Sequence, residues 1–257
     1  DRLYERLADD TADEDLGRRR SVKKVSFCVL LAPDGTLSAL QDERDASGKK
    51  PLPRLLALPG QAKPPGQGLN PCFLWDNSAY LLGYKTDDEK PERTAKAFAA
   101  FRDRHLALAA REPALAADPG FAAVCAFLRA WSPERAAEHK AALDDFAATG
   151  FGVFRLVGEQ GYVHQRPAVS AYWQRASLAG DPDAPRGQCL VTGEADQPLA
   201  LLVEPAIKSV AGAQSSGAKI ISFNCDSFTS YGKEQGLNSP LSQATAFRHA
   251  TALNALL

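Results

Sequence analysis

The middle of the chain is rich in alanine and carries no strand pattern, and this feature constrains the fold most. Within residues 91–148 apolar side chains recur at helical spacing, as at Ala95, Phe98 and Phe101, which predicts amphipathic helices. Runs of β-branched and apolar residues precede and follow this block. We therefore predict a mixed α+β fold, a β-rich domain of short strands with an Ala-rich helical insertion at about 88–149.

Several individual elements are predicted on either side of this block. Residues 23–31 and 36–40 are rich in β-branched and apolar side chains and flank Ala-Pro-Asp-Gly, which predicts a β-hairpin. Residues 49–70 are rich in proline and glycine and predict a long loop, a kind of segment that often carries function. We further expect a hairpin from 153–157 to 162–164, helices at 91–108, 121–129, 133–146, 168–178 and 241–257, and strands at 188–191 and 220–223.

Composition disfavours several classes of protein. The 257 residues are 45% hydrophobic and 24% charged, which is typical of a folded globular protein. The apolar stretches are too short to cross a bilayer and the chain opens on no leader pattern, so neither membrane contact nor secretion is expected. The five cysteines are too far apart for a CxxC or Cys/His ligand pair. This spacing predicts reduced thiols in the cytoplasm, with no metal and no cofactor.

The chain contains no methionine, and it begins and ends in runs with a helical pattern. No motif repeats at a solenoid period. We therefore interpret residues 1–257 as a single N-terminal domain of a longer polypeptide.

Charge is strongly segregated along the chain although the formal net charge is only −1. Residues 1–16 have an excess of acidic groups, whereas residues 17–35 and 44–85 have an excess of basic ones. Local charge decides whether a surface attracts phosphates. In residues 44–85 the basic groups lie among Pro, Gly, Asn and Gln rather than on a helix, which weakens the interpretation that they merely solvate a surface.

Three polar tracts that contain glycine predict contacts with nucleic acid: residues 63–70, 211–219 and 231–238. Lysines can reach phosphates, and amides can pair with base edges. Taken alone, the tract at 211–219 could be a flexible linker and each of the other two a surface turn. The tract at 211–219 does not have the order of a P-loop. The candidate DNA-binding residues are Lys63, Gln67, Asn70, Gln214, Ser215, Ser216, Lys219, Lys233, Gln235 and Asn238.

Two alternatives to nucleic-acid binding stay open. A small cytosolic hydrolase could use Cys225 or Ser222 with His249, although the GxSxG elbow and the cysteine-protease signature are absent. The chain could also be a generic scaffold module whose Gly-rich tracts are linkers. The acidic run at residues 87–89 predicts solvated charge before a helix rather than a metal site.

A series of short motifs, in a fixed order, resembles a known family. They include Phe73-Leu-Trp-Asp-Asn77, Cys189-Leu-Val-Thr-Gly193, Pro205-Ala-Ile-Lys-Ser-Val210, Gly212-Ala-Gln-Ser-Ser-Gly-Ala-Lys219, Ile221-Ser-Phe-Asn224 and Ser230-Tyr-Gly232. They resemble the N-terminal part of the large subunit of the type I-C CRISPR Cascade effector complex. The resemblance covers nearly the whole chain and is most specific from Cys189 onward.

The resemblance implies a non-catalytic subunit. Such a subunit recognises the PAM in duplex DNA, helps to start unwinding and R-loop formation, and contributes to docking of the helicase-nuclease. The implied partners are double-stranded target DNA with its PAM, the crRNA, the other Cascade subunits and the helicase-nuclease. Whether an anti-CRISPR inhibitor also binds this surface is left open.

The three polar tracts suit this implied role, because a PAM needs few base contacts and guide pairing carries the remaining sequence information. The resemblance does not indicate which tract reads bases. Trp75 is expected in the core rather than as a wedge between bases.

Overall fold

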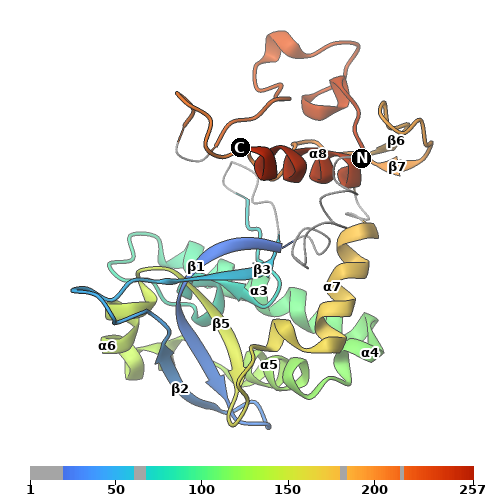
Figure 1. The fold of residues 1–257 in the computed structure, drawn as a ribbon. Helices are drawn as coiled ribbons and strands as arrows, with labels where there is room; N and C mark the ends of the chain where they lie inside the picture. Colours follow the sequence, from blue (N-terminus) through green and yellow to red (C-terminus); the bar gives the residue numbers. More distant parts are fainter. Residues whose placement is uncertain (1–19, 61–67, 180–183, 215–216) are drawn as a thin grey trace. The chain divides into compact units, whose positions relative to one another are not determined.

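The structure is a computed structural model that describes residues 20–60, 68–179, 184–214 and 217–257. The described residues fall into two compact units, Arg20–Trp173 and Gln174–Leu257, and Figure 1 shows the elements of each. The first unit combines one main sheet with several helices, and the second contains little regular strand. This mixture confirms the α+β prediction.

The Arg20–Trp173 unit is built on a five-stranded sheet in the order β2-β1-β5-β4, with β3 paired to β1. The strands are β1 Arg20–Leu31, β2 Leu37–Asp42, β3 Arg54–Pro59, β4 Trp75–Asp76 and β5 Phe151–Leu156. The long central strand β1 pairs antiparallel with β2 through its C-terminal half and with β3 through its N-terminal half, and it pairs parallel with β5.

The predicted hairpin at residues 23–40 is confirmed as β1 and β2, with Val29 opposite Leu40. Its turn uses Gly35 at a φ of 88°, a left-handed conformation that glycine adopts without steric cost. A Cβ at this position would lie 2.6 Å from Cβ of Ala126 in helix α5 (Pro119–Ala130). The hairpin turn therefore packs directly on the helical block.

Two predictions about this sheet are wrong. The segment at 49–70 is not one continuous loop, because the apolar run within it forms β3 and buries Leu58. The second hairpin does not form either, because Tyr162 precedes a 3-10 helix, η3 (Val163–Gln165), rather than a strand. Strand β5 pairs instead with β1 and β4, and its side chains Val153 and Phe154 are buried in two different core clusters.

The segment between β4 and β5 is helical, as predicted. Its elements are α2 Ser78–Leu82, α3 Pro91–Arg111, α4 Pro113–Ala116, α5 Pro119–Ala130, the 3-10 helix η1 Pro133–His139, α6 Lys140–Ala142 and the π-helix η2 Leu143–Ala147. The helices predicted at 91–108 and 121–129 are confirmed. The one predicted at 133–146 is broken, and Ser132 does not cap it, because its hydroxyl bonds Glu134 instead.

The main core lies between the sheet and these helices. Phe27, Val29 and Leu31 of β1 share it with Phe101 of α3 and Phe121 of α5. A smaller cluster lies on the other sheet face and includes Cys28, Val153 and Trp75. The Trp75 side chain is buried and its indole N–H donates a hydrogen bond of 2.8 Å to the Pro59 carbonyl oxygen, which confirms its predicted place in the core.

The motif at residues 73–77 packs against and hydrogen-bonds to several other elements of this unit. The Phe73 ring stacks on Trp173 with ring centroids 5.2 Å apart. Leu74 has a φ of 61°, and its backbone N–H donates to Nε2 of the buried His105 at 3.0 Å. Asn77 caps α2 by accepting a hydrogen bond from the Ala79 N–H. The motif is therefore explained by packing and hydrogen bonding within the fold.

The second unit has a small core and long irregular segments. Its elements are the end of α7 Pro167–Ala179, the strands β6 Arg186–Gly187 and β7 Gln197–Pro198, the 3-10 helices η4 Asp226–Phe228 and η5 Gln235–Asn238, and α8 Gln243–Leu256. The predicted helices at 168–178 and 241–257 are confirmed as α7 and α8. Ile207, Leu241 and Ala250 contribute to the core.

The strands predicted at 188–191 and 220–223 in this unit are wrong. Residues 189–193 form a turn closed by a hydrogen bond from the Gly193 N–H to the Cys189 carbonyl oxygen. Ile220 is exposed and pairs with no strand in the described ranges. The β propensity of a short apolar run depends on its packing against neighbouring strands, so such a run does not form a strand where that packing is missing. Across the part of the chain that the structure describes, no helix has the length and apolar character needed to cross a membrane.

Candidate nucleic-acid interface

The first predicted tract lies mostly outside the described residues, including Lys63 and Gln67. Asn70 is described and belongs to the Arg20–Trp173 unit. It is half-buried, and its backbone N–H donates to the Tyr80 hydroxyl oxygen at 3.3 Å. The other described candidate residues all belong to the Gln174–Leu257 unit, so the interface is built up from that unit.

The second tract is a loop with a fixed base. Ile207 and Ala218 form a two-way backbone pair with N–H to oxygen distances of 2.9 and 2.8 Å. Gly217 has a φ of 105°, and a Cβ there would lie 2.9 Å from the Ile207 carbonyl oxygen. Gln214 is exposed above this base, whereas Ser215 and Ser216 lie outside the described residues. The tract is therefore closed into a loop rather than extended as a linker.

Lys219 is already engaged inside the protein. Its ammonium group donates to the Val203 carbonyl oxygen at 2.9 Å and forms an ion pair with Glu204. A phosphate at Lys219 would therefore have to compete with the Glu204 carboxylate.

The third tract forms a tight hairpin that leads into η5. Ser230 and Lys233 pair through their backbones, with the Lys233 N–H 2.9 Å from the Ser230 carbonyl oxygen. The Asn238 side-chain amide donates to the carbonyl oxygens of Lys233 and Gln235, at 2.9 and 3.2 Å. Asn238 therefore holds this loop in shape, and its NH2 group is not presented to a ligand.

Lys233 and Gln235 differ from Lys219 and Asn238 in their surroundings. Both are exposed. Their side chains form no hydrogen bond or ion pair with any described residue. Among the candidate residues that the structure describes, these two side chains are available on a loop of defined shape.

A close backbone contact at Gly236 anchors the third tract. The Gly236 N–H donates to the Leu201 carbonyl oxygen at 3.0 Å, and the residue is buried. A Cβ here would lie 2.1 Å from the Ala200 carbonyl oxygen. Only glycine lets the hairpin lie this close to residues 200–201.

Gly236→Ala is expected to destabilise this loop by about 1–3 kcal/mol, because the added methyl group forces two backbone segments apart. Amide hydrogen exchange of residues 226–238 should then become faster. Gly48→Ala is the control, since the nearest atom to its Cβ is 3.8 Å away, and it should leave exchange in this segment unchanged. Equal exchange in the Gly236→Ala variant and the unmodified chain would contradict the anchoring role.

Cys189 joins the Cys189–Gly193 turn to the start of α8. Its Sγ accepts a hydrogen bond of 3.3 Å from the Ser242 N–H and lies 3.6 Å from Thr245 Oγ1. Burial alone would raise the pKa of this thiol, but hydrogen bonds from Ser242, Thr192, Thr245 and Val191 together outweigh burial and lower the pKa to about 6. The motif beginning at Cys189 is thus an anchor for α8.

No hydrogen bond among the described residues joins the members of the alternative catalytic set. His249 is half-buried on α8, whereas Ser222 and Cys225 lie on the exposed segment before the third tract. Within the described ranges, His249 forms no hydrogen bond with either residue. Nor does any group of three or more His, Cys, Asp or Glu side chains, among those described, have a geometry that could hold a metal ion.

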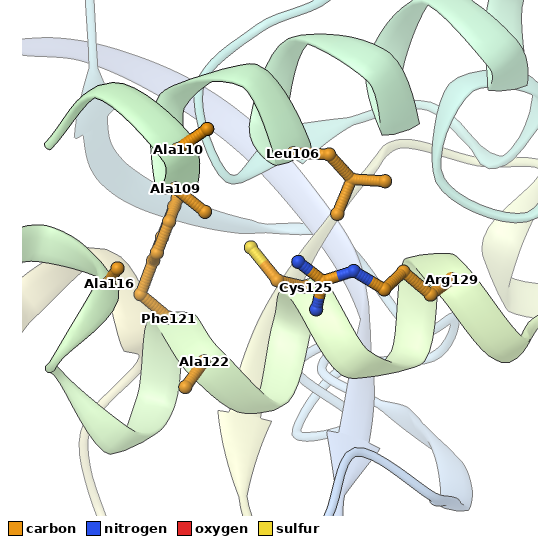
Figure 2. Close-up of a pocket in the computed structure, with 8 residues that line it drawn as sticks. All are labelled: Leu106, Ala109, Ala110, Ala116, Phe121, Ala122, Cys125 and Arg129. Atoms are coloured by element: carbon orange, nitrogen blue, oxygen red, sulfur yellow. The ribbon is translucent and has the colours of Figure 1, made fainter. Parts of the chain in front are cut away.

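A shallow pocket of about 250 Å³ lies between α3 and α5 in the first unit. Figure 2 shows its lining, with Leu106 on α3 and Cys125 and Arg129 on α5. Burial raises the pKa of the Cys125 thiol to about 11, so the thiol stays protonated and unreactive at neutral pH. The remaining lining is mostly alanine. This pocket offers no set of polar groups that converge on a ligand.

Sequence reasoning missed Tyr231, the most exposed aromatic side chain among the residues that the structure describes, although it opens the third tract. Its exposed fraction is 99%. The signal that could have found it is the Tyr-Gly pair between Ser230 and Lys233, since tight hairpins place glycine at such positions.

Comparison with protein families places the chain among CRISPR-associated proteins. The model described as CRISPR-associated protein (Cas_Csd1) matches residues 1–257, so the chain belongs to this family. The match confirms the predicted resemblance to a Cascade large subunit. Membership implies association with the other Cascade subunits and with crRNA. No curated protein matches the chain.

Proposed function

We propose that the exposed loops of the Gln174–Leu257 unit bind duplex DNA at the PAM, within a cytoplasmic, non-catalytic large subunit. Bound there, the subunit helps to start unwinding and contributes to docking of the helicase-nuclease. The observation that carries the proposal is the third tract. It presents Lys233 and Gln235 on a loop that Gly236 and Asn238 hold in shape.

The two exposed side chains have different chemical roles in this proposal. The Lys233 ammonium is a point charge suited to a phosphate, and phosphate contacts fix position without reading sequence. The Gln235 amide has both a donor and an acceptor, so it can pair with a base edge in the major groove. Gln214, exposed on the second tract, has the same chemistry. The proposed contact set also includes Lys63, Gln67 and Asn70 of the first tract and Ser215 and Ser216 of the second. It keeps Lys219, for which a phosphate must compete with Glu204, and Asn238, whose NH2 group is used within the loop.

Lys233→Ala in the full-length protein, assembled with its partner subunits and guide RNA, is expected to weaken binding to PAM-containing duplex. The slope of log affinity against log salt should fall by about one charge, because one phosphate contact is lost. Affinity measured at several salt concentrations checks both effects.

Lys96→Ala is the matched control, because Lys96 is an exposed lysine on α3 of the other unit. It should leave affinity and salt slope unchanged. Unchanged binding in the Lys233→Ala variant would favour the scaffold alternative, and equal losses in both variants would indicate a non-specific effect of charge.

A further inference from the structure

Tyr231 lies at the tip of the third tract in an uncommon backbone conformation. Tyr231 has a φ of 51° and the next residue, Gly232, a φ of 70°. Positive φ at both central positions is the mark of a type I′ turn, whose first position favours Asn, Asp or Gly. The side chain is 99% exposed. The turn thus holds a large aromatic ring entirely in solvent.

Neither feature stabilises the fold. A tyrosine in left-handed conformation is strained, because its Cβ lies close to the following carbonyl oxygen. The exposed ring gains nothing from burial. Strain of this kind persists where the surrounding structure imposes it, and it is found at ligand-binding sites. The Ser230–Lys233 backbone pair and the Gly236 anchor impose it here.

The chemistry around the ring favours a nucleic acid over an apolar protein pocket. Lys233 follows the turn and Gln235 lies two residues further, and both are exposed. Glu234, the acidic residue between Lys233 and Gln235, is also exposed and forms no ion pair with a described residue. Aromatic side chains beside cationic groups are the usual elements of surfaces on which bases stack, and an amide can pair with a base edge.

We propose that Tyr231 stacks its ring on a nucleobase that becomes unpaired where the target duplex opens. The proposal rests on the proposed function, because it needs the third tract to lie against DNA. Stacking is available to any base, since every base has a flat π-face. Tyr231 would hold an opened base without reading its identity, while Lys233 and Gln235 fix the position of the loop.

Three substitutions in the full-length assembled complex separate the ring from the turn. Tyr231→Phe keeps the ring, and Tyr231→Ala removes it. Tyr231→Asn removes the ring but suits the left-handed backbone, so the turn is retained. Tyr231→Ala and Tyr231→Asn should weaken binding to PAM-containing duplex by roughly tenfold, whereas Tyr231→Phe should stay within about twofold.

A fluorescent base analogue locates the contact. We would place 2-aminopurine singly at each of the first positions beside the PAM and measure its fluorescence on binding. Stacking on an aromatic ring should quench one position with the unmodified and Tyr231→Phe complexes. The Tyr231→Ala and Tyr231→Asn complexes should leave that position bright.

The outcomes separate this inference from the proposed function. Full binding and quenching by Tyr231→Asn would overturn the stacking role. If Lys233→Ala weakens binding and Tyr231→Ala does not, stacking fails and the proposed function stands. If neither variant weakens binding, both fail. If the Tyr231→Ala subunit no longer assembles with its partner subunits, the stacking proposal is wrong, and the ring instead contacts another protein subunit.

Discussion

Lowering the pH from 6.5 towards 3 is expected to destabilise the Arg20–Trp173 unit steeply, because His105 must stay neutral in the folded state. Burial lowers the pKa of His105 from 6.5 to about 3, against a smaller opposing effect of its hydrogen bond to Phe101. Both ring nitrogens of His105 have hydrogen-bond partners. Nε2 accepts from the Leu74 N–H, and Nδ1 lies 2.7 Å from the Phe101 carbonyl oxygen.

The direction follows from proton binding. Between pH 6.5 and about 3 the unfolded chain binds a proton at His105 and the folded chain does not. The contribution of neutral His105 to the stability of the fold is therefore fully present above pH 6.5 and is lost as the pH falls from 6.5 to about 3. A single proton gives a slope of about 1.4 kcal/mol per pH unit, so the loss amounts to several kcal/mol at the acid end.

Urea denaturation at a series of pH values measures this slope. All three tryptophans lie in the Arg20–Trp173 unit, so tryptophan fluorescence of this chain reports on that unit. His105→Gln should lower the free energy of unfolding at neutral pH. Between pH 6.5 and 4 its free energy of unfolding should also fall less steeply with decreasing pH, because the contribution of His105 to the slope is gone. His139→Gln, on η1, should keep it. A His105→Gln variant with the slope of the unmodified chain would show that His105 is not the titrating group.

Glu43→Ala is expected to cost about 3–5 kcal/mol of stability, because it leaves a cation and a phenol without their buried partner. Glu43 is 4% exposed. Its carboxylate accepts 2.7 Å from the Tyr162 hydroxyl and 2.9 Å from Arg155 Nη2. Burial, followed by the bond to Glu43, raises the pKa of Tyr162, so Tyr162 stays protonated and donates.

A double-mutant cycle tests this cluster. Arg155→Ala and the Glu43→Ala/Arg155→Ala double variant complete it, with stability measured by urea denaturation. We expect the double variant to lose about 1–2 kcal/mol less than the two single losses combined, because residues in one network couple. Asp42→Ala is the control, since its partner Arg44 also bonds Asp145. Additive losses across the cycle would mean that Glu43 and Arg155 act independently.

Local patterns predicted the elements that depend on neighbouring residues. The β1–β2 hairpin follows from a Pro-Asp-Gly turn between apolar runs, and α3 follows from helical spacing after Pro91. Pairing between distant segments was not predictable. Strand β3 lies in a stretch that proline marks as irregular, and β5 takes β1 as a parallel partner across the whole helical block.

In the candidate site, too, some features follow from the local sequence and others depend on distant partners. The exposure of Lys233 and Gln235 follows from the polar composition of their tract. The internal roles of Lys219 and Asn238 do not, because they depend on Glu204 and on backbone carbonyls placed by the fold. The left-handed backbone at Tyr231 does not follow from the polar composition of the tract, and only the Tyr-Gly pair hints at a tight turn there.

The position of β1 has a consequence for synthesis on the ribosome. The hairpin partner of β1 and the strand β3 follow it directly, but its parallel partner β5 emerges only after α3 and α5. Until β5 is made, one edge of β1 has no partner strand to hydrogen-bond with, and Phe27 cannot pack with Phe154 in the shared core. The nascent chain therefore has to keep an aggregation-prone edge away from other chains while its helices are made. Shielding of that edge by a chaperone is expected to matter most during this interval.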